Sequence, residues 1–471
     1  MAGHLINAAD SVLIWYFLAL NSFYGLLLAL SIPEIWKHWK LSSTDEVSRY
    51  LSSDALPPIS VLMPAYNMES SIVSSVRAQL ALQYPQHEVL LINDGSTDGT
   101  LERLREAYDL YEVPPAMPKS IPTQHVRRYF RARKAAGLMV VDKENGGKAD
   151  ALNAGLNAAR YPLALAVDAD TMVEPDALLR LARVFLSGRP VVAAGGTIRI
   201  ANGCRVQDAQ VVEARLPRQS LPLVQVPEYL RAFLFGRLGW NRLGGNLIVS
   251  GAFGLFHRQH LLEIGGYATD NVVEDLDLVV RLHRHLREQG TPYEISFIPD
   301  PVAWTEVPSD LRTLGRQRER WHRGLILTML RHRSMLLNPR YGTVGMVMMP
   351  FFFFGEMLAP VVELVGYLLT GFGLYFGLID QQMALLFLAA ALGYGMMLTV
   401  WAVILEEVTF RAYTRDSDFA RMLLFAFLEP FGYRQLTVAW RLRSFWSVLR
   451  GRTQWGEMRR TGFQDAQDKA A

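Results

Sequence analysis

The chain has 471 residues, of which 50% are hydrophobic and 20% are charged, and its formal net charge is only +3. This balance excludes a disordered chain, which needs low hydrophobicity and a high net charge. So small a charge gives no argument for nucleic-acid binding. The single cysteine, Cys204, excludes an internal disulfide framework and a cysteine-rich zinc site. The high apolar content is more typical of a membrane protein than of an ordinary soluble enzyme.

An uncharged stretch covers residues 11–32 and ends before Pro33. A helix that crosses a membrane needs about 20 apolar residues, so we expect a transmembrane helix within residues 1–40. The stretch is too long for a signal peptide and has no basic start. Lys37, His38 and Lys40 follow it, and the positive-inside rule places the next region in the cytoplasm.

A second apolar region is expected to form C-terminal membrane crossings at residues 340–433. It contains a stretch at 342–379, interrupted only by Glu356 and Glu363 among charged residues, and an uncharged stretch at 383–405. We expect two full crossings, with four as the alternative, and a short interfacial or tilted helix at 421–431. The two acids either line a polar path or form bonds between helices.

The remaining segment, residues 434–471, is expected to be a cytoplasmic amphipathic tail, because its first half is rich in Arg and Trp. These features together predict a multi-pass protein of the cell membrane, in contact with lipid. The domain at residues 55–335 would then be cytoplasmic.

Apolar runs of β type in that middle domain lie at residues 59–64, 88–92 and 163–167, and helical patterns lie at 70–82, 100–108, 148–160 and 174–186. This alternation predicts an α/β fold with a Rossmann-like, mostly parallel sheet. Ligands bind such sheets outside the carboxyl ends of the strands. Polar residues occupy those ends, namely Tyr66-Asn67, Asn93-Asp94 and Asp168-Ala169-Asp170.

A basic segment at residues 125–134 has five Lys or Arg residues in ten positions. We expect a solvated amphipathic helix there, with a membrane-facing or substrate-facing patch as the alternative. The segment 114–122 just before it contains four prolines and is expected to be a loop.

The first motif with chemistry is Asp168-Ala169-Asp170, directly after an expected strand. Such a motif is common in turns, but two carboxylates at a strand end can also bind a hard divalent cation. The cation would hold a diphosphate and neutralise its charge. We interpret the motif as part of a metal site.

The second motif is Glu274-Asp275-Leu276-Asp277, before a helical pattern. Its simplest explanation is that acids at a helix start oppose the helix dipole. Alternatively, Asp275 is a general base that takes a proton from an attacking hydroxyl.

The third motif places Gln317, Arg320 and Trp321 on one helix face, after a helix start at Asp310. Arginine suits a leaving diphosphate, and tryptophan suits the apolar face of a sugar. The alternative is an amphipathic helix on the membrane surface.

The fourth motif is a glycine-rich turn, Gly146-Gly147, that leads into a helix at Lys148. Such a turn can hold anionic groups. Because it lacks the Walker spacing, we do not interpret it as an ATPase site.

The four motifs in this order resemble the membrane-embedded family-two glycosyltransferases, the inverting group that includes cellulose, chitin, hyaluronan and poly-N-acetylglucosamine synthases. The resemblance covers about residues 57–325 and implies a GT-A fold, a UDP-sugar donor and Mg²⁺ or Mn²⁺. It implies the following roles: Tyr66 and Asp94 at the nucleotide base; Lys148 and Asp168 on the nucleotide-sugar; Asp170 on the metal; Asp275 as base; Arg320 at the leaving group; and Glu274, Gln317 and Trp321 at the acceptor. The run Ser250-Gly251-Ala252 matches a small-residue loop near the acceptor.

Three positions depart from the family pattern. Met68 stands where an acid is common, with Glu69 one place later, which weakens any role for that acid. Asn93 replaces the first of two frequent aspartates, so contact with the nucleotide base falls to Asp94. Val273 replaces a frequent threonine before the acidic pair Glu274-Asp275. The resemblance implies inverting transfer of N-acetylglucosamine or glucose from a UDP-sugar to a growing polysaccharide, with export across the membrane. The alternatives are non-processive transfer to a lipid-linked acceptor and a catalytically silent, nucleotide-binding subunit of an envelope complex.

Overall fold

The computed structural model describes residues 2–42, 56–114, 120–378, 381–413 and 415–451. The chain divides into two compact units, which are described separately below. The helical unit combines segments from Met1–Ile35, Leu216–Leu243 and Pro308–Gly456. The sheet unit combines described segments from Trp36–Arg215 and Gly244–Val307.

The sheet unit is built on one mixed sheet that has ten strands in the described part of the chain. Its order is β3-β4-β5-β2-β1-β6-β11-β8-β12-β7, and β5, β2, β1 and β6 are parallel neighbours. These four strands are Leu138–Lys143, His87–Asp94, Ile59–Ala65 and Leu163–Val167. The others are β3 (Leu110–Val113), β4 (Val126–Ala132), β11 (Phe253–His257), β8 (Val191–Ile200), β12 (Glu294–Thr305) and β7 (Met172–Val173). The expected α/β fold with a parallel centre is confirmed.

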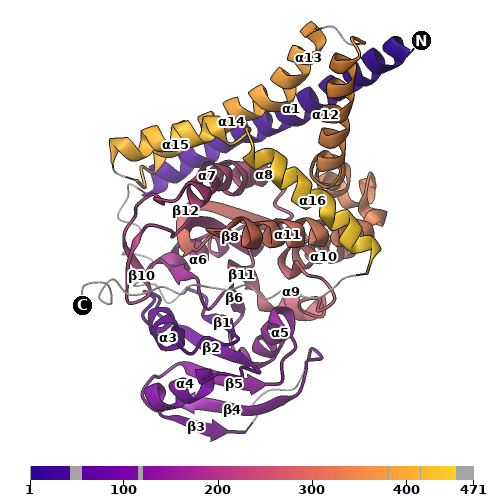
Figure 1. Cartoon of the computed structure of the whole chain (residues 1–471). Helices are drawn as coiled ribbons and strands as arrows, with labels where there is room; N and C mark the ends of the chain where they lie inside the picture. Colours follow the sequence, from indigo (N-terminus) through magenta and orange to yellow (C-terminus); the bar gives the residue numbers. More distant parts are fainter. Residues whose placement is uncertain (1, 43–55, 115–119, 379–380, 414, 452–471) are drawn as a thin grey trace. The chain divides into compact units, whose positions relative to one another are not determined.

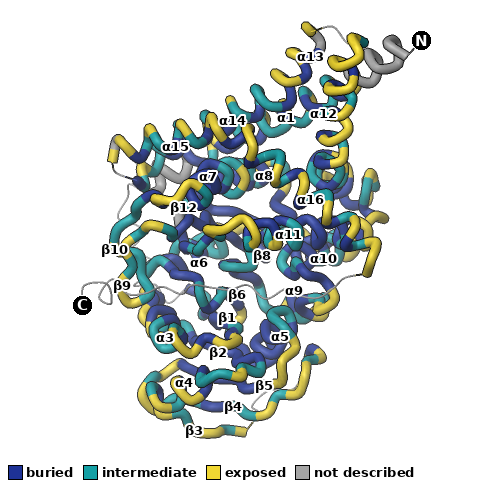
Figure 2. Tube along the Cα trace, viewed as in Figure 1, coloured by how far each residue is buried: buried dark blue, intermediate teal, exposed yellow. Residues whose placement is uncertain are grey.

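Both faces of this sheet are buried, as Figures 1 and 2 show for the strands at its centre. Side chains alternate between faces along a strand, so Val61 and Val89 lie in one core while Leu62 and Leu90 lie in the other. The first core includes side chains from α3 (Ile72–Leu80), α4 (Thr100–Tyr108) and α6 (Ala177–Phe185). The second includes side chains from α5 (Lys148–Ala158) and α10 (Glu274–Gln289). The helices expected from the sequence therefore form, with slightly shorter bounds.

The basic segment at residues 125–134 is a strand, so the expectation of an amphipathic helix was wrong. Strand β4 pairs antiparallel with β3 and β5. Its Phe130 is buried, and the guanidinium groups of Arg105 and Arg128 lie 4.9 and 5.5 Å from the centre of that ring. Aromatic and β-branched residues favour a strand, and pairing with the buried strand β5 outweighed the charge pattern. The preceding proline-rich segment lies mostly outside the described residues.

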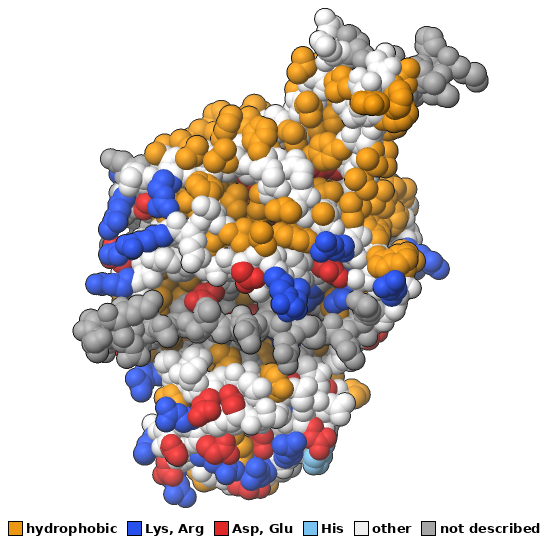
Figure 3. Space-filling view, in the orientation of Figure 1, with side chains coloured by type: hydrophobic (Ala, Val, Ile, Leu, Met, Phe, Trp, Pro, Cys, Tyr) orange, Lys and Arg blue, Asp and Glu red, His pale blue; other side chains and the backbone are white. Residues whose placement is uncertain are grey.

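The helical unit contains two helices that are long and apolar enough to cross a membrane among the residues described, at Ser11–Trp36 and Ala384–Thr409. A third candidate arises if the pair Val344–Met357 and Ala359–Tyr375, bent by 44°, counts as one crossing. The chain is therefore membrane-associated, and the described C-terminal part holds at most two candidate crossings, while the number of actual crossings stays a prediction. Figure 3 shows hydrophobic side chains gathered over α12 (Ala359–Tyr375), α13 (Gln381–Leu388) and α14 (Tyr394–Thr409).

The first membrane helix does not end at Pro33, as the sequence suggested, because α1 extends over Ala2–Ser42. A proline inside a helix removes one backbone hydrogen bond, but packing against neighbouring helices can compensate in membrane proteins. Here Glu34 forms an ion pair of 2.6 Å with Arg242 of α8 (Gly236–Arg242). Leu27 lies so close to the same helix that a Cβ at Gly239 would be 2.3 Å from its carbonyl oxygen.

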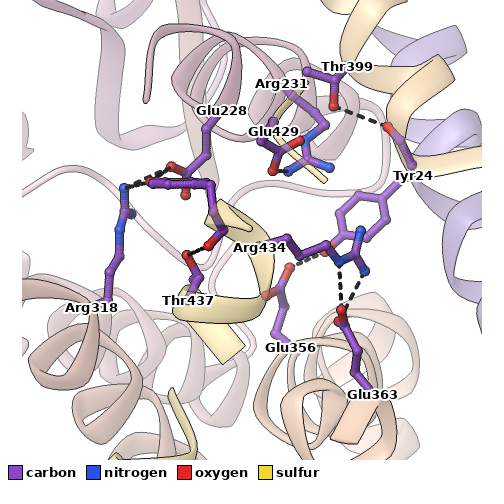
Figure 4. A network of polar contacts seen from close by, with 12 residues as sticks. Tyr24, Glu228, Arg231, Arg318, Glu356, Glu363, Thr399, Glu429, Arg434 and Thr437 are labelled. Atoms are coloured by element: carbon purple, nitrogen blue, oxygen red, sulfur yellow. Dashed lines mark hydrogen bonds and ion pairs between the residues drawn. The ribbon is translucent and has the colours of Figure 1, made fainter. Parts of the chain in front are cut away.

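The two acids of the C-terminal membrane region form bonds between helices (Figure 4). Glu363 of α12 accepts hydrogen bonds of 2.8 and 3.1 Å from Arg434 of α16 (Tyr433–Leu449). Glu356 of η5 (Phe351–Met357) accepts from Tyr24 of α1 and from Arg441. This agrees with the second of the two sequence interpretations. Helix α16, the described part of the expected tail, is thus bound to α12, η5 and their neighbours by ion pairs and hydrogen bonds.

The other elements of the helical unit are mostly short. They are α7 (Ser220–Tyr229), η1 (Leu230–Phe235), α11 (Leu311–Arg331), η2 (Arg333–Met335), η3 (Pro339–Tyr341), η4 (Val344–Met348), η6 (Ala389–Gly393) and α15 (Asp416–Leu428). The last of these corresponds to the expected short helix at 421–431, and it is not among the candidate crossings.

Candidate functional site

Lys148 joins three of the motifs that the sequence singled out. It is the first residue of α5, and its Nζ lies 2.6 Å from Asp168 Oδ1 and 3.1 Å from Glu274 Oε1. It also donates a 2.9 Å hydrogen bond to the carbonyl oxygen of Gly251. The glycine-rich turn, the aspartate motif after β6, the acidic start of α10 and the small-residue loop therefore meet at one ammonium group.

Gly251 extends this cluster to Asp275. Its backbone N–H donates to Asp275 Oδ2 at 2.7 Å, and the N–H of Leu276 donates to Asp275 Oδ1 at 2.8 Å. A Cβ at position 251 would lie 3.1 Å from Asp275 Oδ2. The small residue is needed because a side chain there would crowd the carboxylate.

Burial and neighbouring charges shift two of these groups. Burial raises the pKa of Asp275, the Glu274 carboxylate raises it further, and the Lys148 charge and two backbone N–H groups oppose the rise without cancelling it. Burial lowers the pKa of Lys148, but the charges of Asp168 and Glu274 outweigh burial and raise the pKa above its usual value. Lys148 is thus a permanent cation beside a carboxyl whose pKa is moved towards that of a useful base.

Tyr267 also lies near this cluster, and no motif in the sequence pointed to it. Its backbone exchanges two hydrogen bonds with the buried Asn153 of α5, 2.7 Å to Asn153 Oδ1 and 2.9 Å from Asn153 Nδ2. Burial raises the pKa of the Tyr267 phenol, and the charges of the cluster also act on it. It follows two glycines in a segment without a strand or helix pattern, where spacing predicts no contact.

Asp94 is buried at the end of β2, where its carboxylate holds the glycine-rich turn. It accepts hydrogen bonds from the N–H groups of Gly146 at 3.0 Å and Gly147 at 2.8 Å, and it pairs with Lys143 Nζ at 2.6 Å. Tyr66, after β1, is 51% exposed. Contact of either side chain with a nucleotide base stays a prediction.

Asp168 and Asp170 lie in the turn that follows β6, where the N–H of Thr171 donates to the carbonyl oxygen of Asp168 at 2.9 Å. Within the described ranges, no group of three or more His, Cys, Asp or Glu side chains is arranged to hold a metal ion by itself. Two carboxylates nevertheless fit Mg²⁺ or Mn²⁺, because Mg²⁺ usually takes one or two carboxylates and completes its shell with phosphate and water.

The third motif lies in the helical unit, on α11, which begins where expected. Asp310 Oδ1 caps the helix by accepting from the Thr313 N–H at 2.9 Å. Trp321 packs edge-on against Phe233, with ring centres 6.2 Å apart, and the Arg318 guanidinium lies 4.7 Å from the Trp321 ring centre.

Gln317, Arg320 and Trp321 are half-buried. They belong to a different unit from Asp275. Their expected roles at the leaving group and the acceptor stay predictions.

Known families match most of the described chain. Residues 60–261 match "Glycosyl transferase family 2", and residues 164–406 match "Glycosyl transferase family group 2". A poly-beta-1,6-N-acetyl-D-glucosamine synthase of Staphylococcus epidermidis is 29% identical over 267 residues, which are 56% of this chain and 54% of that protein. The synthase of the same name from Staphylococcus aureus strain COL is 28% identical over 58% of this chain and 56% of its own. The chain thus spans about half the length of these curated relatives.

Among solved structures, the mannosyltransferase PcManGT from Pyrobaculum calidifontis, in complex with GDP-Man and Mn²⁺, is similar with a TM-score of 0.48 and 17% identity. The alignment covers 90% of this chain and 99% of that one.

Proposed function

The chain belongs to glycosyl transferase family group 2, and from this premise we propose that it transfers a sugar with inversion from a UDP-sugar to a growing polysaccharide. The observation that carries the proposal is the cluster at Lys148. The Lys148 ammonium contacts Asp168 and Glu274. It also donates to the carbonyl oxygen of Gly251, whose N–H donates to Asp275. This arrangement supplies a cation for a diphosphate next to a base for a hydroxyl.

Asp275 is the proposed general base. In the reaction, an acceptor hydroxyl gives its proton to Asp275 while its oxygen forms a bond to the anomeric carbon of the donor. The bond between that carbon and the diphosphate oxygen breaks, and UDP leaves with the bonding electrons. The N–H groups of Gly251 and Leu276 hold the carboxylate in one orientation, and such preorganisation lowers the barrier.

The leaving diphosphate is the second requirement of the reaction. Lys148 and, on our proposal, Arg320 provide fixed positive charge for it, because preorganised charge is often the largest catalytic contribution. Asp170 would hold Mg²⁺ or Mn²⁺ there, and Asp168, which pairs with Lys148, would lie on the nucleotide-sugar side. When bound, such a cation neutralises charge on the diphosphate.

Recognition of the two substrates completes the assignment. We assign Tyr66 and Asp94 to the nucleotide base, and Glu274, Gln317 and Trp321 to the acceptor sugar. The sheet unit would face the cytoplasm, and the membrane helices would carry the polymer outward. The donor sugar that we favour is N-acetylglucosamine, which is supported by the names of the two staphylococcal relatives.

A donor panel tests this proposal. The purified full chain in detergent is incubated with UDP-N-acetylglucosamine, UDP-glucose and GDP-mannose, each with Mg²⁺, Mn²⁺ or EDTA, and products are sized. We expect UDP release and a long polymer with UDP-N-acetylglucosamine, and loss of both with EDTA. Single additions to a lipid would instead support the non-processive alternative, and nucleotide binding without release from any donor would support a silent subunit.

A further inference from the structure

Lys143, the last residue of β5, is fully buried although it is charged. Its Nζ lies 2.6 Å from Asp94 Oδ1 and 2.6 Å from Asp150 Oδ1, and it donates to the carbonyl oxygen of Glu144 at 2.5 Å. The two carboxylate side chains are only 5% and 7% exposed. Lysine is almost never fully buried unless it is paired. We call these three residues the Lys143 ion cluster.

The Lys143 ion cluster encloses the glycine turn, residues 144–147. On one side, Asp94 accepts from the N–H groups of Gly146 and Gly147, and its carbonyl oxygen accepts from Asn145 Nδ2 at 2.8 Å. On the other side, a Cβ at Gly146 would lie 2.4 Å from Asp150 Oδ1. The backbone of the turn is therefore held between two carboxylates that share one ammonium group.

The glycine turn sets the position of Lys148. Gly147 has a φ of +86°, which a residue with a side chain rarely adopts, and α5 begins at the next residue. Since Lys148 makes the contacts that join the site, a displacement of the turn moves its ammonium away from Asp168 and Glu274. Misplacement by about 1 Å can cost on the order of 100-fold in rate.

The cluster carries one positive and two negative charges, and backbone N–H groups supply the remaining contacts. Gln124 N–H donates to Asp150 at 3.0 Å, and the glycine turn donates to Asp94. If the ammonium is lost, two buried carboxylates remain close together without a cation, which is strongly unfavourable. Because the glycine turn lies between them, we expect it to shift so that water reaches the two carboxylates.

We propose that Lys143 is a positioning residue for the nucleotide-sugar donor: its buried ammonium holds Asp94 and Asp150 against the glycine turn and so places Lys148. This inference rests on the proposed function, because the donor is what Lys148 would bind. The proposal goes beyond the assignment of Asp94 to the nucleotide base. It also gives the Asp94 carboxylate the role of holding the glycine turn within the protein.

Lys143→Met tests the proposal in the full chain in detergent, with two measurements. Hydrogen exchange of a peptide covering residues 144–152 reports the order of the turn without any donor. Calorimetric titration with UDP and Mg²⁺ reports the donor site. We expect exchange at least tenfold faster in this peptide and UDP binding at least tenfold weaker, measured well below the melting temperature.

Arg160→Met is the matched control, because it breaks an ion pair at the other end of α5. Arg160 Nε lies 2.7 Å from Glu88 Oε2, and the Glu88 side chain is 3% exposed. This variant should lower the melting temperature while leaving UDP affinity within twofold and exchange at 144–152 unchanged. If Lys143→Met shows the same pattern as Arg160→Met, Lys143 only stabilises the fold and the proposal is wrong.

Gly146→Ala provides a second test that keeps every charge, and it decides the question if Lys143→Met does not fold. The added Cβ displaces Asp150 from the turn, so we expect faster exchange and at least tenfold weaker UDP binding. Unchanged UDP affinity would overturn the proposal. A third outcome is that the wild-type protein binds no UDP but the exchange differences still appear. In that case the proposed function and the role of Lys143 at the donor are both wrong. The result would then show only that Lys143 orders the glycine turn.

Discussion

Asp275→Asn is the substitution that most directly tests the proposed chemistry. In the wild-type protein, Asp275 Oδ2 accepts from Gly251 N–H at 2.7 Å and Oδ1 accepts from Leu276 N–H at 2.8 Å. Asparagine keeps the volume and one acceptor oxygen, but it cannot take a proton from a hydroxyl. The change therefore removes the base with little change in shape.

The expected size of the effect comes from two contributions. Loss of a positioned general base costs about 10²- to 10⁴-fold in rate, or about 2.7–5.4 kcal/mol in the activation barrier. One backbone N–H also loses its acceptor, which costs about 1–3 kcal/mol in stability if that group stays buried. UDP affinity should change by less than about threefold, because the contact of Lys148 with Asp168 is untouched.

The assay is UDP release with the preferred donor, together with calorimetric UDP binding. Asp277→Asn is the control, because Asp277 lies in the same helical turn and pairs with Arg281 at 2.8 Å. That variant should lose stability but keep turnover. Turnover of Asp275→Asn within tenfold of wild type would remove Asp275 from its role, and an equal loss in both variants would indicate general damage to α10.

The raised pKa of Asp275 predicts that the transfer rate depends on pH. Because burial and Glu274 raise the pKa of Asp275, the base loses its activity at a higher pH than an ordinary aspartate would. The rate should therefore rise with pH through that raised pKa, with an acidic limb in kcat/KM that lies above the usual aspartate range. This limb should be absent from the residual rate of Asp275→Asn.

Three further substitutions test neighbouring parts of the argument. Lys148→Met removes the cation beside two carboxylates, so UDP affinity, measured by calorimetry, should fall at least tenfold. Arg434→Met leaves the buried Glu363 with the Tyr367 hydroxyl but without its cation and should lower stability by about 3–5 kcal/mol, seen as a lower melting temperature in detergent and partly restored by adding Glu363→Met. Asn93→Asp should lower the melting temperature, because it sets a second carboxylate against Asp142, and Asn93→Asp combined with Asp142→Asn should restore it.

The centre of the fold could be predicted from the sequence because its pattern has a local cause. Strands β1, β2 and β6 are apolar on both faces, since helices cover the sheet on both sides, and such strands are continuous apolar runs. Their carboxyl ends lie at one edge in any parallel sheet. The contact of Lys148 with Asp168 is therefore within reach of sequence reasoning, whereas its role in the reaction still requires experiment.

Contacts that depend on tertiary structure were beyond such reasoning. Strand β4 reads as a basic amphipathic segment, and only its pairing with β5 and the burial of Phe130 make it a strand. The backbone contact of Tyr267 with Asn153 joins residues that are 114 positions apart. Lys143 lies three positions before Gly146, but nothing in its spacing shows that its charge is buried between two aspartates.

Asn93 shows how a departure from a family pattern can be resolved by its surroundings. The residue is buried, and its Nδ2 donates a 2.8 Å hydrogen bond to Asp142 Oδ1, on the neighbouring strand β5. Among the described residues, the cation paired with Asp142 is Arg128, at 3.4 Å, and its side chain is 40% exposed. An aspartate at position 93 would place two carboxylates within hydrogen-bonding distance, where like charges strongly disfavour ionisation of both. The amide therefore balances Asp142, and the departure removes no group from the proposed reaction, because the carboxylate of Asp94 beside it keeps its contacts with the glycine turn.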